Sequence, residues 1–299
     1  MPRLGRVIAV ANMKGGVGKT TTVVMLAEAL AADGNRVLVI DLDAQASVSY
    51  CLAGDDILAE LIKDRLTITS YLTDRLLHQR RRSLREFVRS QISDVTHLGD
   101  PLDVSLIASS VGLRLAEREI ICELADRGFN LHGTEGQVWS ALSSCMAELR
   151  EDFDYVILDC APGISAFTEV GIRLCDVVIL PTIPDMLSTL GLAAFCNSMW
   201  RGRLAERSSL PKPKRRPVVL VSRRIANVKH QALTVAALRQ VAAGEDPEFD
   251  MFETEIPQAA AIAEGLSKDY PTFRLKWSPP VVAILNSLVN EVKGLFHGH

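Results

Sequence analysis

A glycine-rich segment with two lysines is the strongest chemical signal in the sequence. Residues 12–21 read Asn-Met-Lys-Gly-Gly-Val-Gly-Lys-Thr-Thr and stand between a short apolar run and a helix-like segment. Glycines let the backbone curl so that its N–H groups face an anion, and the helix dipole adds to the attraction. The pattern predicts a phosphate-binding loop. The residues that we assign to it are Lys14, Gly15, Gly16, Val17, Gly18, Lys19, Thr20 and Thr21.

Individual side chains of this loop have distinct expected tasks. Lys19 is expected to reach the β- and γ-phosphates of a nucleoside triphosphate, and the hydroxyl of Thr20 to ligate Mg²⁺. Thr21 is assigned to the α-phosphate. The alternative is an accidental glycine-rich turn, which the Gly-Lys-Thr-Thr run between a strand and a helix makes a poor explanation.

Two further apolar runs end in aspartates. Residues 37–45 read Val-Leu-Val-Ile-Asp-Leu-Asp-Ala-Gln, and residues 155–163 read Tyr-Val-Ile-Leu-Asp-Cys-Ala-Pro-Gly. Carboxylates at the carboxyl ends of parallel strands face the ligand crevice. We expect Asp159 to hold Mg²⁺ through its water shell, because Mg²⁺ sheds water reluctantly, and Asp41 to lie close to the metal. One such aspartate could equally be a cap or turn residue, but two in this order favour function.

The surrounding segments alternate between short β-branched runs and longer amphipathic stretches. The expected strands span residues 6–12, 36–41, 104–108, 155–159, 177–181 and 218–222, and the expected helices 20–33, 111–127, 136–152, 166–175, 190–206, 229–243 and 280–295. This predicts an α/β fold with a doubly wound, mostly parallel twisted sheet flanked by helices. We expect one domain over residues 1–299, with a divergent insertion of one or two surface helices around 55–100 and a C-terminal helix around 280–295.

Composition excludes several other classes of protein. With 299 residues, 48% hydrophobic, 23% charged and a net charge of −3, the chain is not generally polybasic. Six scattered cysteines without a C-x-x-C pair predict buried reduced thiols, and six histidines show no zinc-ligand spacing. No run approaches the roughly 18 apolar residues of a membrane span and no leader is recognised, so we expect a cytoplasmic protein.

A local run of basic residues is the candidate for contact with nucleic acid. Residues 201–229 contain one acid, Glu206, and the basic residues Arg201, Arg203, Arg207, Lys212, Lys214, Arg215, Arg216, Arg223, Arg224 and Lys229. Such a run favours salt-sensitive, sequence-independent binding to the DNA backbone. The alternative is a solvated loop that only keeps the protein soluble.

The glycine-rich loop departs from the general P-loop in a way that resembles the deviant Walker A motif of the ParA/MinD family. Met13 replaces the usual first glycine, and Lys14 is an extra lysine. Residues 41–45 resemble the second motif of that family, and the segments 105–117, 179–192 and 255–264 are similar to later ones, the last near the adenine side. By this resemblance Lys14 crosses a face-to-face dimer interface to touch the partner's nucleotide, and Asp43 serves the attacking water. Gln258, where a basic residue is usual, and the region 55–100 depart from the family.

The resemblance implies an ATPase that forms a homodimer on binding ATP and Mg²⁺ and then binds a carrier surface. Slow hydrolysis, stimulated by a ParB-like or other activating partner, releases it. The carrier is nonspecific DNA in ParA-like members and membrane in MinD-like members, and the cargo is a plasmid, a chromosome or a protein cluster. The residues that we assign to DNA are Arg215, Arg216, Arg223, Arg224, Lys229 and Lys276.

We therefore expect a ParA-like partitioning or positioning ATPase, associated with the nucleoid and without stable membrane insertion. A MinD-like membrane-associated ATPase stays open, although residues 285–296 carry one lysine against one glutamate and are better explained by a helix packed on the domain. A metabolic synthetase of the same fold also stays open and would require a small carboxylic acid. The nitrogenase iron protein shares the loop, but Cys122 and Cys160 lack the glycine-rich surroundings of its cluster ligands.

Overall fold

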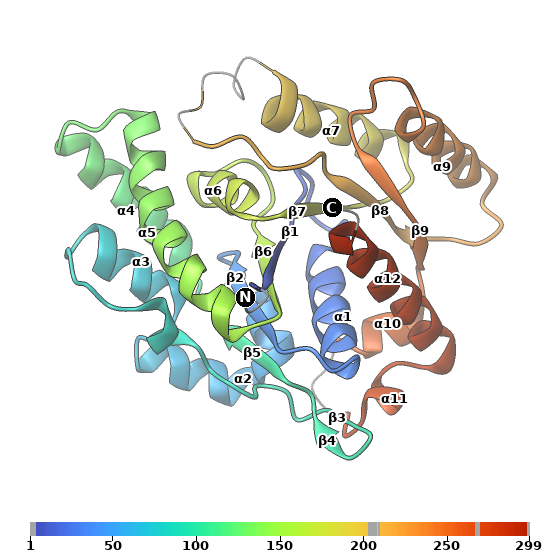
Figure 1. The fold of residues 1–299 in the computed structure, drawn as a ribbon, viewed down its shortest axis with the longest axis horizontal. Coiled ribbons are helices and arrows are strands. Elements are labelled where there is room, and N and C mark those ends of the chain that lie inside the picture. The colour runs from blue at the N-terminus through green and yellow to red at the C-terminus, as the bar shows by residue number, and fades with distance from the viewer. Residues whose placement is uncertain (1–3, 203–207, 209, 267–269, 298–299) are drawn as a thin grey trace.

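A seven-stranded sheet forms the centre of the computed structural model, which describes residues 4–202, 208, 210–266 and 270–297 (Figure 1). All its strands pair in parallel, in the order β5-β2-β6-β1-β7-β8-β9. They are β1 (Arg6–Val10), β2 (Val37–Leu42), β5 (Val104–Ile107), β6 (Tyr155–Cys160), β7 (Val177–Thr182), β8 (Val218–Arg224) and β9 (Asp250–Pro257). The predicted fold class is confirmed. The edge strand β9 was not expected, because Phe252 and Ile256 are its only fully buried residues and its apolar signal is weak.

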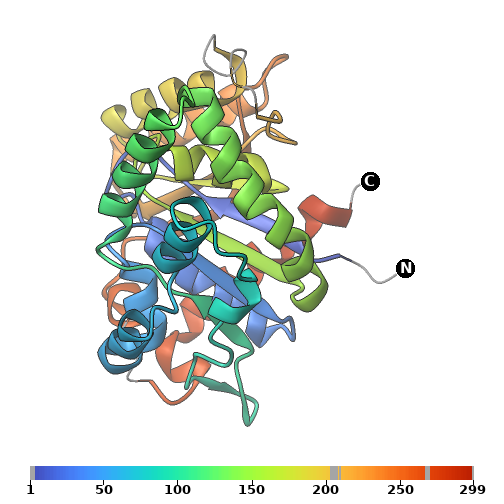
Figure 2. The same ribbon diagram turned by 90° about the vertical axis from the view of Figure 1, so that its left-hand side faces the viewer.

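Helices cover both faces of this sheet, as a doubly wound fold requires. One face is covered by α3 (Ile68–Leu76), α4 (Leu113–Asp126), α5 (Leu131–Asp152), α6 (Ala166–Leu174), α7 (Met186–Cys196) and α9 (Lys229–Ala242). The other is covered by α1 (Lys19–Ala32), α2 (Ser47–Lys63), α10 (Ala260–Glu264), α11 (Phe273–Lys276) and α12 (Pro279–His297). The chain begins and ends on the side of the molecule where β1 starts (Figure 2).

The region around residues 55–100 contributes more to the core than expected. In α3, Tyr71 and Leu72 are fully buried against the sheet, so this helix is not a surface helix. The segment beyond it bonds to the free edge of β5, where the N–H groups of Arg89 and Ile92 donate to carbonyl oxygens at 2.8 Å. A short antiparallel pair, β3 (Thr96–His97) and β4 (Asp100–Pro101), follows. This region therefore closes a sheet edge that would otherwise invite pairing with another chain.

Helix α7 begins earlier than expected, and helix α12 packs on the core. The expected helix 190–206 starts earlier, because Asp185 caps α7 by accepting a hydrogen bond from the Ser188 N–H, and it continues as a π-helical turn over Asn197–Arg201. Arg203, Glu206 and Arg207 lie outside the described residues. Helix α12 buries one apolar face, including Leu285 and Val292, in the core. No helix within the described ranges is long and apolar enough to cross a membrane.

The six cysteines form no disulfide in the structure and differ in burial. All six are free; three of them, Cys160, Cys175 and Cys196, are buried, whereas Cys122 is exposed. Burial raises the pKa of the Cys175 and Cys196 thiols to about 12, so they are inert at neutral pH.

Candidate functional site

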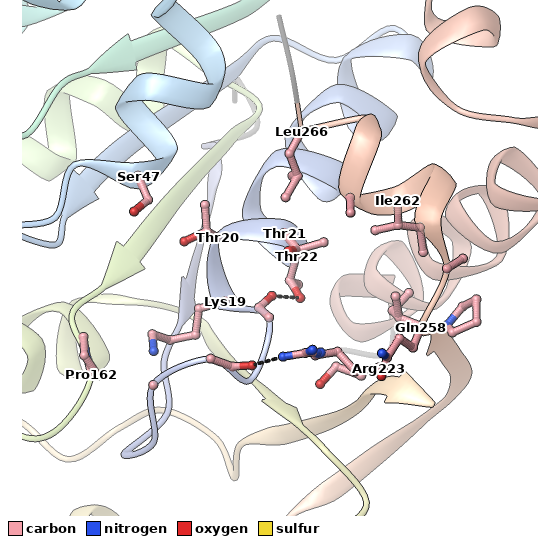
Figure 3. Close-up of a pocket in the computed structure, with 18 of the residues that line it drawn as sticks. Lys19, Thr20, Thr21, Thr22, Ser47, Pro162, Arg223, Gln258, Ile262 and Leu266 are labelled. Atoms are coloured by element: carbon pink, nitrogen blue, oxygen red, sulfur yellow. Dashed lines mark hydrogen bonds between the residues drawn. The ribbon is translucent and has the colours of Figure 1, made fainter. Parts of the chain in front are cut away.

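A cavity of about 740 Å³ opens at the carboxyl ends of the central strands (Figure 3). The phosphate loop forms its floor, because β1 ends at Val10 and α1 begins at Lys19. Gly16 and Gly18 have φ angles of 73° and 91°, a left-handed backbone that favours glycine. Parallel strands and the amino end of a helix thus direct backbone N–H groups at one point, the arrangement that binds phosphate.

Most of the predicted phosphate residues line this cavity. They are Gly15, Gly16, Gly18, Lys19, Thr20 and Thr21. Val17 is buried instead, and its carbonyl oxygen accepts a 2.7 Å hydrogen bond from Ser222, which fixes the loop against β8. Burial lowers the pKa of Lys19, while the charges of Asp159 and Asp43 oppose that shift. A bound phosphate would add negative charge beside this amine and further favour its protonated form.

Two strand-end carboxylates lie side by side next to the loop. Asp41 of β2 and Asp159 of β6 are paired in register, and both are fully buried. Neither oxygen of Asp159 has a hydrogen-bond partner among the described residues. Burial, and then the neighbouring charges of Asp41 and Asp43, raise its pKa well above the usual value. An unpaired buried carboxylate of this kind fits a cation or its bound water, which would hold the charged form.

Asp41 differs from Asp159 because both of its carboxylate oxygens accept hydrogen bonds. One of its oxygens accepts from the Ser49 N–H at 3.0 Å and the Ser49 hydroxyl at 2.6 Å, and the other accepts from the Asp43 N–H at 3.0 Å. Burial raises its pKa to about 6. Asp41 lies beside Asp159 in the register of the sheet, so its assignment to the metal stays a prediction. Its hydrogen bond from the Asp43 N–H also positions Asp43.

The remaining donors suit magnesium. No group of three or more His, Cys, Asp or Glu side chains forms a ligand cluster within the described part of the chain. Mg²⁺ does not need such a cluster, because it keeps several waters and uses one or two protein groups together with substrate phosphates. Thr20 in the cavity and the free carboxylate of Asp159 fit that requirement.

Asp43 stands where two cavities meet. It lines the phosphate cavity and also a groove of about 680 Å³ between α4 and residues 161–167. One of its oxygens accepts the N–H of Gln45 at 2.9 Å, and the carboxylate is half-buried. The carboxylate is therefore accessible from the phosphate cavity, and its role in orienting the attacking water stays a prediction.

Lys14 points away from the cavity formed by its own chain. Its amine donates to the Ser188 hydroxyl at 3.0 Å and lies 3.7 Å from a carboxylate oxygen of Asp185. The side chain remains 42% exposed. The sequence did not single out Asp185 or Ser188, although an aspartate just before an apolar helical run is a helix-capping signal. Lys14 is thus the one expected catalytic residue that the structure does not bring to the phosphate loop's own cavity.

The wall opposite Asp43 comes from β8, β9 and α10. Gln258, Ile262 and Leu266 line it, in agreement with the expected adenine side (Figure 3). Arg223 lines it too. This residue has a left-handed φ of 52°, and its guanidinium donates to the Gly16 carbonyl at 3.0 Å. Arg223 was assigned to DNA from the sequence, but here it borders the nucleotide cavity.

The other residues assigned to DNA do not form one patch. Arg215 and Arg216 precede β8, whereas Arg224 and Lys229 follow or end it, and a strand of this length separates its ends by about 20 Å. Arg216 pairs with Asp250 at 2.9 Å and Arg224 with Glu255 at 3.4 Å. The side chain of Arg215 donates to the Leu295 carbonyl.

The assignment of Lys276 to DNA is wrong. Its side chain is buried and forms a 2.6 Å ion pair with Glu28 of α1, whose other oxygen accepts from the indole N–H of Trp277. Removing either charge would leave the other unpaired in the core, so this pair holds α11 against α1. A lysine in such a pair is not available to a DNA backbone.

Comparison with known proteins agrees with this geometry. The AAA domain family matches residues 5–210. A chromosome partitioning protein ParA of Myxococcus xanthus is 28% identical over 233 residues, which cover 77% of this chain and 70% of that protein. An uncharacterized protein of Mycobacterium tuberculosis is 30% identical over 194 residues, 65% of this chain and 52% of its own. The chain spans about half the length of the first curated relatives that it matches.

Solved structures share the fold over nearly the whole chain at low identity. Apo McdA of Cyanothece superposes with a TM-score of 0.69 at 20% identity, covering 97% of this chain and 99% of that one. Cobyrinic acid a,c-diamide synthase of Mycobacterium smegmatis with ADP and magnesium gives 0.65 at 20%, covering 99% and 96%. The pNOB8 ParA bound to nonspecific DNA gives 0.62 at 19%, covering 97% and 99%. Because the matched family model covers most of the chain, the chain belongs to the AAA domain family, and its similarity to ParA and Soj proteins and to the solved McdA and ParA structures supports a ParA/MinD-type P-loop ATPase.

Proposed function

We propose that the chain is a ParA-like ATPase that uses Mg²⁺ and ATP, closes as a homodimer around two nucleotides and binds nonspecific DNA in that state. It positions or segregates a cargo, and slow hydrolysis, stimulated by a ParB-like or other partner protein, releases the DNA. The observation that carries the proposal is the orientation of Lys14, whose amine lies outside its own cavity and is partly exposed. An amine placed there serves a nucleotide held by a second copy.

Exposed apolar side chains around Lys14 support the proposal that a second copy covers this face in the ATP-bound dimer. Met186 and Leu187 follow Asp185 directly and are 77% and 72% exposed. On the other side of the loop, the Gly163 N–H donates to the Asn12 carbonyl, and the next residue, Ile164, is 42% exposed. Clustered apolar surface of this kind is typical of an interaction face. Closure of two copies would bury it and bring Lys14 to the opposite nucleotide.

The same end of the sheet is the better candidate for DNA. Lys229 is exposed at the start of α9 and has no ion pair with any described residue, and Arg223 borders the cavity nearby. A DNA contact at this end would respond to nucleotide binding and to dimerisation. Lys229, the nucleotide cavity and the face around Lys14 all lie at the carboxyl ends of the strands. Such a protein would be found in the cytoplasm on the nucleoid. A tail-anchored membrane mode is disfavoured, since the apolar face of α12 is already packed in the core.

The test compares oligomeric state and DNA retention without nucleotide, with ADP and with ATP. Light scattering after size exclusion should show a dimer with Mg-ATP, and only that species should retain DNA. Lys14→Ala should keep ATP binding and lose the dimer, while Lys63→Ala, at an exposed site on α2, should behave as wild type. Asp43→Ala should trap the ATP-bound dimer on DNA.

Three outcomes would contradict the proposal. A monomer at saturating Mg-ATP that retains neither DNA nor liposomes would exclude the carrier mechanism. Retention on liposomes without DNA retention would support the membrane-associated alternative. Turnover that requires a small carboxylic acid and ignores DNA would support a synthetase, the activity that the name of one structural neighbour states.

A further inference from the structure

A second cavity, of about 330 Å³, lies at the amino ends of the strands. Its lining comes from α5, from the end of α6 and from the segment before β8. Leu174 precedes β7 and Lys212 precedes β8, whereas the phosphate loop follows β1 at its carboxyl end. The cavity is therefore separated from the nucleotide cavity by the length of the strands, about 20 Å.

The cavity combines an apolar floor with a cationic rim. Trp139, Met146 and Pro211 supply aromatic and aliphatic surface. Four cationic side chains surround it: Arg150, Arg173, Lys212 and Lys214. An apolar recess ringed by positive charge is complementary to an apolar group that carries negative charge beside it.

The positive charge is not balanced locally. Arg150 and Lys214 both contact the same carboxylate oxygen of Asp176, so one negative charge faces two positive charges. Arg173 is buried and paired with Glu169 at 2.7 Å. Lys212 is exposed and has no ion pair with any described residue. The four cations thus share two carboxylates, and the surplus lies on the rim at Lys212 and Lys214.

We propose that this cavity is a docking site for an acidic peptide segment of a partner protein. A large aliphatic or aromatic side chain of the segment enters the recess and packs on Trp139, and flanking carboxylates pair with Lys212, Lys214 and Arg150. Aromatic and arginine side chains around a recess are the features that anchor peptide side chains in protein interfaces. Their combination with unbalanced positive charge selects acidic partners over basic ones.

Other polyanions fit this place less well. Nonspecific DNA binding draws on several phosphate contacts along a surface, whereas the unpaired charge here amounts to about two cations around a recess. A membrane surface is met by protruding apolar side chains, but these are recessed. A side chain of a peptide is the group that enters a recess of this size.

The position has a consequence for how a partner could act. A segment bound at the amino ends contacts neither the phosphate loop nor the face around Lys14. Occupancy therefore need not compete with nucleotide or with dimerisation, and the site suits constant attachment of a partner in every nucleotide state. Peptide binding at this cavity is separate from the proposed function, because it can be measured without nucleotide.

The test begins with phage-displayed random 12-residue peptides selected on the full-length protein without nucleotide. Selected sequences should be enriched in Asp and Glu next to Leu, Phe or Trp. The best peptide, synthesised with a fluorophore, should bind equally well with no nucleotide, ADP or ATP. Anisotropy titrations should show about tenfold weaker binding to Lys212→Glu, because one favourable charge contact becomes a repulsion.

A second variant probes the recess itself. Ala147 is exposed on α5 and lines the cavity, so Ala147→Glu places a carboxylate among the cations and should weaken the peptide by a similar factor. Lys63→Glu on α2 and Ala125→Glu on α4 make the same changes outside the cavity and should bind like wild type. All four variants should keep wild-type melting temperatures and ATP affinity.

Two results of the peptide experiments would overturn the docking site, and one result with other polyanions would reassign it. One is a selection without acidic enrichment, and the other is a peptide that binds both cavity variants as tightly as wild type. If Lys212→Glu instead abolished retention on DNA or on anionic vesicles while no peptide bound, the surface would belong to that polyanion and not to a protein partner.

Discussion

The two ends of the central sheet differ in how their charges are satisfied. At the amino ends, ion pairs join the residues that lead into the strands: Arg36 with Asp154 at 3.1 Å, Arg150 with Asp176 at 2.9 Å and Arg216 with Asp250 at 2.9 Å. At the carboxyl ends, Asp159 is buried without a partner and Lys19 has a lowered pKa. At the amino ends the buried charges are paired and the surplus positive charge lies on exposed lysines, whereas at the carboxyl ends a buried carboxylate has no partner among the described residues.

This contrast separates buried charges that stabilise the fold from buried charges that require a ligand. Groups that are paired within the chain stabilise the fold, whereas buried charges without partners destabilise it until a ligand supplies the opposite charge. The carboxyl ends of the strands also carry residues with left-handed backbone, namely Gly16, Gly18 and Arg223, and the exposed apolar residues near Lys14. Removing a paired carboxylate at the amino ends should therefore lower stability, whereas removing the unpaired one at the carboxyl ends should raise it, and only mutations at the carboxyl ends should affect nucleotide binding.

The largest expected effect is on nucleotide affinity. Lys19→Ala removes the cation that faces the phosphates, and ATP affinity measured by calorimetry should fall about a hundredfold or more. Lys214→Ala, which removes a lysine at the amino ends, should leave ATP affinity unchanged. Normal nucleotide affinity in Lys19→Ala would refute the assignment of the phosphate loop.

The next effect is on the pH dependence of stability. The pKa of Asp159 is raised in the folded chain, so the ligand-free protein loses stability as pH rises above the unfolded value near 4. Asp159→Asn should raise the melting temperature at pH 7 by a few degrees and flatten its decline as pH rises above the unfolded value near 4. It should also abolish the extra stabilisation by Mg-ATP.

Asp176, at the amino ends of the strands, should show the opposite pH dependence. Burial alone would raise its pKa, but hydrogen bonds from Arg150, Lys214 and the Val7 N–H together lower it. Its stabilisation is therefore present above the unfolded value near 4 and is lost as pH falls through the lowered folded value. Asp176→Asn should lower the melting temperature at pH 7, and this deficit should shrink in acid. The same sign of change in both variants would contradict the contrast between the ends.

Sequence patterns predicted the residues at the carboxyl ends of the strands better than those at the amino ends. Motifs such as Gly-Lys-Thr-Thr and strand-end aspartates are local, because a phosphate site needs particular residues at fixed spacing. The positions of Asp159, Thr20 and Lys19 were therefore accessible from the sequence. The split of the basic run was not, since it depends on β8 running between Arg216 and Arg223 and on the partners that each arginine meets.

The partner of Lys276 in the core was likewise not predictable from the sequence. In the sequence Lys276 resembles any exposed lysine near a chain end, and its partner Glu28 lies 248 residues away. Only the packing of α11 on α1 brings the two together. Likewise, β9 carries a weak apolar pattern, because it is an edge strand with few fully buried side chains. Pairings at long sequence separation and edges of sheets leave little local signal.

A smaller effect should come from the residue that holds Lys14 in its own chain. Asp185→Asn keeps a good helix cap but removes the charge opposite Lys14. If this exposed ion pair opposes closure, the protein concentration for half-dimerisation with ATP should fall two- to fivefold, the range of a surface pair. Asp64→Asn, an exposed carboxylate after α2, serves as the control. A loss of dimer in Asp185→Asn would instead place Asp185 among the groups that support the closed state.

The smallest effect distinguishes the ends as DNA-binding surfaces. Each phosphate contact contributes about 0.9 to the slope of log affinity against log salt. Lys229→Ala should therefore reduce that slope by about one per chain and weaken DNA retention at low salt, because this lysine is exposed and unpaired among the described residues. Arg216→Ala should leave the slope unchanged, since its guanidinium already pairs with Asp250. If Arg216→Ala changed the slope and Lys229→Ala did not, DNA would lie at the amino ends, and the link between nucleotide state and DNA binding would have to pass through the whole length of the sheet.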